Sequence, residues 1–513
     1  MHLIPETLKN KALHYFKHLD EQTLKKYYSE AEREINGRIQ ACSIVERIET
    51  EDFGEIEKEI TDSIHNLTLS LIQYEEDRQQ FGGQFKNIFE FAHHFNVKAT
   101  IFEQCVTLGH PFHPMTKTKL GLTYESVLRY APEFRNCVKI IPLIIDKSLA
   151  GHFGTVQLPV SYMEQIYEIA AQYNIKHPEI IFIHEWQLNH YFNEHTSLLN
   201  SKTCIPIESL SVTGYPLLSF RTLYVPMFKC VIKAAVNAQA TSAVRNVSPA
   251  SIHNGVLLGK YVSKLYEQYD GCFIQQDLGG TYLEQSPHEN KLSYMMRETI
   301  SYENHQYAVV CASLISKSFI TDQAIVIEAI DIIRHHQRIS REAAAMIFFE
   351  KYTHILLKAT YRLMLEHQIS LEAHMQNSSI VLEYGVPKAI YIRDFGGIRI
   401  SDDSVHIDKR TGLFTNDFED LLSVFTHAVL YNHLFQLIKP LSTFANEQKL
   451  YDTIYQEIAT INDTYKPPVN VLKQRKLKVK SLLKMRLYGD SYDYKYSEIK
   501  NPLMKEDFRC GKA

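Results

Sequence analysis

The segment from Leu371 to Gly397 constrains this chain most, because a predicted tight hairpin carries polar residues at both of its ends. Two short apolar runs, 380–383 and 389–392, flank a Gly-Val-Pro turn, which is typical of a β-hairpin. The polar side chains that should meet at its open end are Glu372, His374, Asn377 and Asp394. Such groups could hold Mg²⁺ and an oxygen-rich ligand, and the glycines after Asp394 would let a substrate approach the backbone. The alternative is a buried polar turn that only satisfies its own hydrogen bonds.

The composition is that of an ordinary globular protein. Hydrophobic residues make up 45% of the 513 positions and charged residues 22%, which suits a chain with a large core. A net charge of −4 argues against a nucleic-acid partner. The first residues lack the pattern of a signal peptide, and no apolar run reaches the ~18 to 20 residues that span a bilayer. We therefore expect a cytoplasmic protein with no membrane partner, and its eight scattered cysteines predict reduced thiols.

The periodicity of apolar residues divides the chain into three regions. Residues 1–95 are predicted to be helical, because apolar residues between 53 and 74 recur at spacings of three and four. Residues 96–320 contain short apolar runs separated by turns, which indicate a mixed sheet. Residues 321–513 are again mainly helical and include the hairpin. Their basic stretch, 473–486, predicts a solvated amphipathic helix, or one whose cations reach into the pocket of an acidic substrate. The fold class is therefore α+β.

A first polar cluster lies at residues 109–121, GHPFHPMTKTKLG. Its two prolines stiffen the loop and fix the directions of His110 and His113. Lys117 and Lys119 follow on an extended piece. Imidazole and ammonium donors in such a loop suit phosphate oxygens, although a rigid surface turn explains the same residues equally well.

A second polar cluster follows a predicted strand and its return. Its members are Ser219, Arg221, Thr222, Lys233, Thr241 and Arg245. Hydroxyls beside three cations would form a cradle for phosphates and a carboxylate, whereas the alternative is a set of ordinary surface cations. The Walker A loop and the dinucleotide-binding G-x-G-x-x-G are both absent from the sequence.

Two segments partly match known functional motifs but lack residues that those motifs require. His184 and His190 are six residues apart, and Leu188 stands where the zinc-binding H-E-x-x-H needs histidine. Asp394-Phe395-Gly396 matches the metal-binding triplet of protein kinases, but the upstream turn lacks the aspartate that would accept a hydroxyl proton. A kinase-like phosphotransferase using Asp394 therefore stays open only as an alternative, as does a non-enzymatic scaffold.

Taken in order, these motifs resemble the siderophore synthetases that work independently of nonribosomal peptide synthetases, the aerobactin-synthetase-like family. The resemblance runs from about residue 100 to 503. It is carried by GHPFHPMTKTKLG at 109–121, YAPEF at 130–134, HEWQ at 184–187, SFRT at 219–222, Lys233, TSAVR at 241–245, EAHMQN at 372–377, RDFGG at 393–397, KSLLKMRL at 480–487 and NPL at 501–503.

The resemblance implies a cupped-hand architecture with a helical thumb (1–95), fingers with a mixed sheet (96–320) and a mainly helical palm (321–513). It implies a ligase for siderophore biosynthesis that uses ATP and Mg²⁺. The enzyme would adenylate a carboxylate of citrate or a related acid and release pyrophosphate. An amine, such as a polyamine, a diamine or an amino acid, would then displace AMP. Relatives are often homodimers, and a composition rich in Lys, Ile, Asn and Tyr favours a staphyloferrin-type product.

The resemblance also implies roles for individual residues. Nucleotide phosphates would lie among His110, Ser219, Arg221, Thr222, Lys233 and Asn377. The carboxylate substrate would be held by Thr241, Arg245, His374 and Gln376. The residues expected to act in catalysis are Lys233, Arg245 and His374, and those expected to hold Mg²⁺ are Glu372 and Asp394. No residue stands out as the base that deprotonates the amine.

The sequence departs from the family pattern at two positions. Glu185 replaces the proline of the usual H-P-W-Q, which removes a rigid residue and adds a charge. Lys119 stands where arginine is common, so a bidentate contact would be lost there. The region before the first motif is also short, which leaves the contacts of the thumb and the selection of the amine open.

Overall fold

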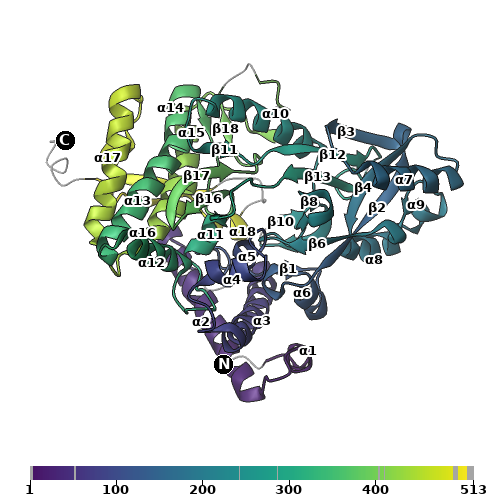
Figure 1. The fold of residues 1–513 in the computed structure, drawn as a ribbon, viewed down its shortest axis with the longest axis horizontal. Helices are drawn as coiled ribbons and strands as arrows, with labels where there is room; N and C mark the ends of the chain where they lie inside the picture. Colours follow the sequence, from purple (N-terminus) through teal and green to yellow (C-terminus); the bar gives the residue numbers. More distant parts are fainter. Residues whose placement is uncertain are drawn as a thin grey trace.

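The computed structural model describes residues 4–50, 53–241, 243–285, 287–401, 405–408, 411–488 and 495–504. Long N-terminal helices lie at the bottom of Figure 1, a long antiparallel sheet lies to the right, and a group of helices from the last third of the chain lies to the left. The mixture of helices and sheets confirms the predicted α+β class.

The N-terminal region consists of α1 (Glu6–Tyr15), α2 (Glu21–Glu46) and α3 (Glu57–Phe81). The Asp20 carboxylate caps α2 by accepting a hydrogen bond from the Thr23 backbone N–H at 2.7 Å. The apolar face predicted for α3 is buried against α2. Two shorter helices, α4 (Ile88–His94) and α5 (Ile101–Gln104), instead contribute to the core of the C-terminal helices. The proposed boundary at residue 95 remains a prediction.

The long sheet has the strand order β3-β12-β13-β8-β7-β6-β2-β4, with β5 beside β2. All of these pairings are antiparallel. Its strands are β2 (Val138–Asp146), β3 (Ala150–Gly154), β4 (Pro178–His184), β5 (Ile205–Pro206), β6 (Val212–Pro216), β7 (Thr222–Val225), β8 (Cys230–Ala234), β12 (Asp277–Leu283) and β13 (Ser293–Glu298). Helices in the same region are α6 (Tyr124–Tyr130), α7 (Val160–Gln172), α8 (Glu185–Glu194), α9 (Thr196–Asn200) and α10 (Pro249–Tyr266).

A small sheet joins the two polar clusters. It consists of β1 (Lys119–Leu120), β9 (Val236–Ala240) and β10 (Ala243–Arg245). Lys119 pairs with Ala240, and the Thr241 backbone N–H donates to Thr118 O at 3.0 Å. The loop at 109–121 therefore lies directly beside the start of the TSAVR segment.

The predicted hairpin is confirmed as β16 (Ser378–Glu383) and β17 (Val386–Ile392). It lies at the centre of a sheet with the order β11-β17-β16-β14, whose outer strands are β11 (Cys272–Ile274) and β14 (Gln306–Val310). Strand β14 ends at Val310, and the apolar run continues as α11 (Cys311–Leu314).

Most of the last third of the chain is helical, as predicted. Its elements are α12 (Ile325–Gln337), α13 (Arg341–Leu357), α14 (Leu363–His367), β15 (Ile369–Ser370), β18 (Arg399–Ile400), α15 (Phe418–Phe425), α16 (Phe435–Leu441) and α17 (Glu447–Tyr465). Two π-helical segments, 358–362 and 426–434, continue α13 and α15. Helix α16 contains Pro440 and ends at the next residue, Leu441.

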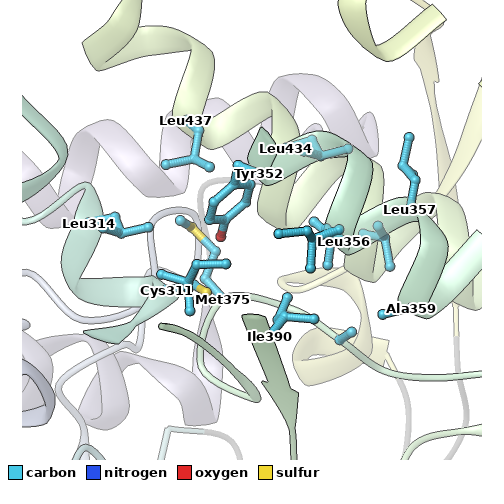
Figure 2. Close-up of a cluster of buried hydrophobic side chains, with 14 of the residues drawn as sticks. Cys311, Leu314, Tyr352, Leu356, Leu357, Ala359, Met375, Ile390, Leu434 and Leu437 are labelled. Atoms are coloured by element: carbon cyan, nitrogen blue, oxygen red, sulfur yellow. The ribbon is translucent and has the colours of Figure 1, made fainter. Parts of the chain in front are cut away.

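The helical core supports the turn that precedes the hairpin. Figure 2 shows Met375 lying between Tyr352 and Cys311 in this core, and Met375 itself is buried. Among the described residues, Phe418–Leu441 is long and apolar enough to cross a membrane, but 83% of its most apolar window is buried inside the fold. Its hydrophobicity is therefore accounted for by packing in the core.

The prediction for the basic stretch 473–486 is wrong. Residues Lys476–Lys480 form β19, which pairs with β20 (Tyr496–Lys500), and only Lys484–Tyr488 is helical, as α18. From 476 to 479 exposed lysines alternate with buried Leu477 and Val479. This period of two is the pattern of a half-buried strand. Lys480 breaks the alternation and points inward.

Candidate active site

The loop that carries His110 is held by the two long N-terminal helices. From α2, Arg38 donates to the backbone oxygens of His110 and, at 3.4 Å, of His113. From α3, the Ser63 hydroxyl donates to Pro114 O at 3.1 Å and the Asn66 amide to Lys117 O at 2.9 Å. These contacts satisfy backbone carbonyls that would otherwise be buried unpaired. They fix the loop against α2 and α3.

His110 is held as a neutral hydrogen-bond donor. Its Nδ1 accepts the backbone N–H groups of Phe112 at 3.3 Å and His113 at 3.2 Å. Burial, together with the nearby rings of His113 and His374, lowers the pKa of His110 well below its usual value. A neutral ring that accepts at Nδ1 carries its proton at Nε2. His110 can therefore donate to an anionic oxygen.

The second polar cluster places two guanidinium groups side by side. Arg221 donates from Nη1 to Asn246 O at 2.6 Å, and Arg245 donates from Nη2 to the Thr241 hydroxyl at 3.3 Å. Burial and the nearby Arg245 charge lower the pKa of Arg221 to about 9. The Nε atoms of both arginines are buried without a partner among the described residues. Such groups suit an anionic ligand that supplies the missing acceptors.

Thr241 adopts an unusual backbone conformation. Its φ is +57°, a left-handed value that is uncommon for a β-branched residue. The Gln239 side chain donates to its carbonyl oxygen at 3.3 Å. Such conformations cluster at functional sites because the surrounding structure must hold them.

The hairpin end brings together the residues that were expected there. The Asn377 amide donates to Glu372 O at 3.1 Å. The Arg393 backbone N–H donates to Asn377 O at 2.9 Å. Glu372, His374 and Asp394 are close enough to shift one another's pKa values. The predicted convergence is therefore confirmed.

Each of the two candidate metal ligands contacts a lysine. Lys233 Nζ lies 2.7 Å from Asp394 Oδ2, and Lys480 Nζ lies 2.7 Å from Glu372 Oε1. Burial alone would raise the pKa of Asp394, but the charges of Lys233 and Arg297 bring it well below its usual value. Both carboxylates are therefore ionised at neutral pH.

Gly397 lies against the side chain of Glu372. A Cβ atom on Gly397 would lie 1.9 Å from Glu372 Oε2. Gly397 thus makes room for the Glu372 carboxylate of the protein itself. The two carboxylates come close together because of this approach.

A cleft with about 950 Å³ of space, including its open mouth, connects the three groups. Of the predicted site residues, those that line it are His110, Ser219, Thr241, Arg245, His374 and Gln376. The others adjoin it without lining it: Arg221, Thr222, Lys233, Glu372, Asn377 and Asp394. They remain connected to the lining, because Thr222 pairs with Lys233 across β7 and β8 and Lys233 contacts Asp394.

Lysines of the first motif add positive charge to the cleft. Lys117 and Lys119 line it, and Glu133 lies 3.2 Å from Lys117 Nζ and 3.9 Å from Lys119 Nζ. Burial lowers the pKa of Lys117 to about 8, although Glu133 opposes the shift. The two ammonium groups face one carboxylate, so this wall of the cleft favours anions.

The donor set fits Mg²⁺ as an ion shared with a phosphorylated ligand. Mg²⁺ prefers a few carboxylate oxygens completed by waters and phosphates. Glu372 and Asp394 supply such oxygens, and the lysines that contact them show that the pair attracts cations. Among the described residues no group of three His, Cys, Asp or Glu side chains could hold a metal unaided.

Sequence reasoning missed several residues at the site. Lys480 was noted only as part of a basic stretch, and its inward direction follows from the break in the alternation of β19. Asn432 lines the cleft from the π-helical segment 426–434. Its position depends on a distortion of the helix that the apolar spacing does not indicate. Arg297, which contacts Asp277 at 2.6 Å, had no motif to mark it.

The HEWQ segment supports the sheet rather than the cleft. The Gln187 side chain accepts from Asn237 N at 2.8 Å and donates to Lys291 O at 3.0 Å. His184 caps α8 by accepting from the Trp186 backbone N–H at 3.0 Å. Glu185, the departure from the family pattern, forms an ion pair with Arg129 at 2.9 Å. The charge added by Glu185 is thus neutralised locally.

Two family models match parts of the chain. Residues 98–316 match the IucA / IucC family, and residues 346–495 match a family described as ferric iron reductase FhuF-like transporter. Residues 98–316 thus form a domain similar to the IucA / IucC family. This domain contains the first and second polar clusters, and the hairpin lies in the second matched region. The resemblance inferred from the motifs is confirmed.

Two curated relatives come from Staphylococcus aureus (strain NCTC 8325 / PS 47). Staphyloferrin A synthase is 29% identical over 431 residues, which cover 79% of this chain and 73% of the relative. D-ornithine–citrate ligase is 24% identical over 509 residues, which cover 88% of this chain and 77% of the relative.

Among solved structures, ATP-bound aerobactin synthetase IucA from a hypervirulent pathotype of Klebsiella pneumoniae has a TM-score of 0.72 at 17% identity. The match covers 87% of this chain and 82% of that one. It shows that the two proteins share a fold and confirms the predicted architecture class.

Proposed function

We propose that this protein is an ATP-dependent ligase of siderophore biosynthesis that joins a carboxylate of citrate, or of a related acid, to an amine. The single observation that carries this proposal is the meeting of three groups at one cleft: the His110 loop, the Thr241–Arg245 segment and the residues His374 and Gln376 before the hairpin, beside which the carboxylates of Glu372 and Asp394 lie. The names of the relatives, a synthase and a citrate ligase, support the same reaction class.

The charges at the cleft suit the first step. A carboxylate oxygen of the acid attacks the α-phosphorus of ATP, a new O–P bond forms, and pyrophosphate leaves. Two anions must approach each other, so preorganised cations have to offset their repulsion. Arg245 with Thr241, and His374 with Gln376, would hold the acid. The nucleotide phosphates would lie among His110, Ser219, Arg221, Thr222, Lys233 and Asn377.

The second step needs little from the protein beyond placement. The amine nitrogen attacks the acyl carbon, the C–O bond to AMP breaks, and a proton passes to solvent. Arg245 would remain bound to the free carboxylates of the acid and keep the acyl group in position. The reaction requires no covalent intermediate on a side chain.

Glu372 and Asp394 would hold Mg²⁺ together with phosphate oxygens. The ion would neutralise phosphate charge while pyrophosphate leaves. Lys233 and Lys480 contact these carboxylates. We include Lys233 and His374 with Arg245 as the residues that stabilise the transferring groups.

Product analysis tests the proposal. The protein is incubated with ATP, Mg²⁺, citrate and a panel of diamines, polyamines and amino acids, and the nucleotides and condensed products are identified by chromatography and mass spectrometry. We expect AMP and pyrophosphate in equal amounts, together with an amide of citrate. Formation of ADP with a phosphorylated product would establish the kinase-like alternative instead. If 2-oxoglutarate supports product formation and citrate does not, the acid substrate is different and the reaction class stays the same.

A further inference from the structure

A groove on the outer side of the His110 loop is not used by the reaction as derived so far. It lies between helix α2, the loop residues Pro111 and Phe112, the π-helical segment and β19. Counted with its open mouth, as for the cleft, it holds about 720 Å³ of space. Pockets for small organic ligands span roughly 300 to 1,000 Å³. The groove therefore has room for a small organic molecule such as an amino acid.

The groove adjoins the cleft. Pro111 lines both cavities, and the neighbours Tyr431 and Asn432 line one cavity each. Lys480 lines the groove while its ammonium group contacts Glu372 at the hairpin end. The groove and the cleft therefore share Pro111 as part of their walls.

The middle of the groove has an apolar, rigid floor. The rings of Phe112 and Tyr431 are stacked, with centroids 4.5 Å apart and planes 3° from parallel. Gly37 of α2 also lines the groove, and a Cβ atom added there would meet nothing within 4 Å. Glycine is the least favourable helix residue after proline, and no close contact requires it here. Its absent side chain leaves the groove open.

The N-terminal end of the α2 wall contributes two charged residues of opposite sign to the groove. Arg33 and Glu34 both line it. Arg33 makes one weak contact among the described residues, from Nε to Ser29 O at 3.4 Å. Glu34 uses Oε1 to accept from Arg38 at 2.8 Å. A guanidinium and a carboxylate that line the same groove can bind the carboxylate and the ammonium of an amino acid.

We propose that this groove binds the amine substrate and that it selects an amino acid with a second amine over a polyamine. Arg33 binds the α-carboxylate and Glu34 the α-ammonium. The aliphatic chain lies across Phe112 and Tyr431, and the terminal amine passes Pro111 to reach the acyl adenylate. This assignment rests on the proposed function, because it names the second substrate of that reaction.

The first test uses two amines that differ only in the group that Arg33 would bind. Ornithine and putrescine share the same aliphatic chain, and putrescine lacks the carboxylate. We expect the wild-type protein to prefer ornithine in kcat/KM. In Arg33→Met that preference falls about tenfold through loss of ornithine turnover, with putrescine unchanged. Lys25→Met removes an exposed cation of the same helix outside the groove and should change neither value.

The second test fills the groove. Gly37→Leu places a side chain in the open space and also improves the helix propensity of α2, so the protein should fold at least as well as the wild type. We expect the KM for ornithine to rise at least tenfold, with citrate-dependent ATP–pyrophosphate exchange within twofold of the wild type. Gln40→Leu, an exposed position on α2 that lines neither cavity, is the matched control.

The outcomes separate the two proposals. If Gly37→Leu shows normal pyrophosphate exchange and an unchanged KM for ornithine, the groove does not bind the amine, and the proposed ligase reaction still stands. The same conclusion follows if Arg33→Met loses turnover of ornithine and of putrescine equally. Absence of exchange in the wild type overturns the ligase. In that case, calorimetric titration with ornithine tests the groove independently of any reaction. Binding of ornithine that weakens about tenfold in Gly37→Leu supports the groove as its binding site. Binding that is absent in the wild type, or unaffected in Gly37→Leu, contradicts it.

Discussion

Arg245 and Arg221 keep buried Nε atoms without acceptors among the described residues. An unsatisfied buried N–H is destabilising unless a ligand supplies the missing oxygen. Only a guanidinium offers two parallel N–H groups to a carboxylate. The geometry at Arg245 therefore points to a bidentate contact with the acid.

Arg245→Lys tests that contact. It keeps the charge and removes the fork, so we expect the rate of citrate-dependent exchange to fall on the order of 10² fold, the usual effect of losing one preorganised donor. Arg475→Lys, at an exposed position, should have no effect. An Arg245→Lys enzyme with wild-type kinetics for citrate would remove Arg245 from the acid site.

Lys117 predicts a dependence of nucleotide binding on pH. Burial lowers the pKa of its ammonium to about 8, so raising the pH above 8 converts Lys117 to the neutral amine. The Kd for ATP, measured by calorimetry, should then increase up to tenfold per pH unit above 8. Lys117→Met should bind ATP weakly, and its Kd should not change with pH in this range. Lys139 is an exposed cation of β2, and Lys139→Met should show the same pH dependence as the wild type. A Kd for ATP that stays constant up to pH 9.5 in the wild type would show that the ammonium group of Lys117 does not contact the nucleotide.

The hairpin is the element that aligns the two carboxylates, and one ion pair attaches it to α5. Arg393 contacts the Glu103 carboxylate and donates to Gln376 O at 2.9 Å. Both side chains are about nine-tenths buried. Removing one partner of a buried pair leaves the other charge without compensation.

We expect Glu103→Gln to lower the free energy of unfolding by about 3 kcal/mol, measured from the midpoint of urea denaturation. Glu168→Gln, an exposed position on α7, is the control. Replacing both partners, as in Glu103→Leu with Arg393→Met, should recover part of the loss. A midpoint unchanged in Glu103→Gln would show that the pair does not hold the hairpin.

The two ends of the hairpin provide an internal comparison for the metal. Asp394 lies at the open end, whereas Glu383 lies at the turn end, where it contacts Lys388 at 2.8 Å. We expect Asp394→Asn to raise the Mg²⁺ concentration for half-maximal activity at least tenfold. Glu383→Gln should leave it unchanged. Equal Mg²⁺ requirements in both variants would argue against a metal site at Asp394.

Sequence reasoning succeeded for elements whose apolar spacing is regular and failed where it is not. The hairpin, α3, α12, α13 and α17 follow from their periods. The stretch 473–486 was taken for a helix because its charges were counted and the alternation of Leu477 and Val479 was not. The π-helical segment 426–434 keeps a nearly helical apolar pattern, so its displaced Tyr431 and Asn432 could not be foreseen.

At the scale of the whole molecule, the site is assembled from segments far apart in the sequence. The His110 loop is held by α2 and α3, Lys119 pairs beside Thr241, and Lys233 crosses to Asp394. The order of the motifs identified these segments, because each brings a residue type that the reaction needs. Their contacts depend on tertiary packing, so the pairing of Lys480 with Glu372 was visible only in the structure.

The central claim is that this assembled cleft activates an acid by transferring AMP to it. Exchange of labelled pyrophosphate into ATP, with citrate and Mg²⁺ present and amine absent, tests it most directly because it reports the first step alone. We predict exchange that requires both citrate and Mg²⁺ and that is lost in Arg245→Ala and Asp394→Asn. Exchange that proceeds without any acid, or that survives in Arg245→Ala, would contradict the account.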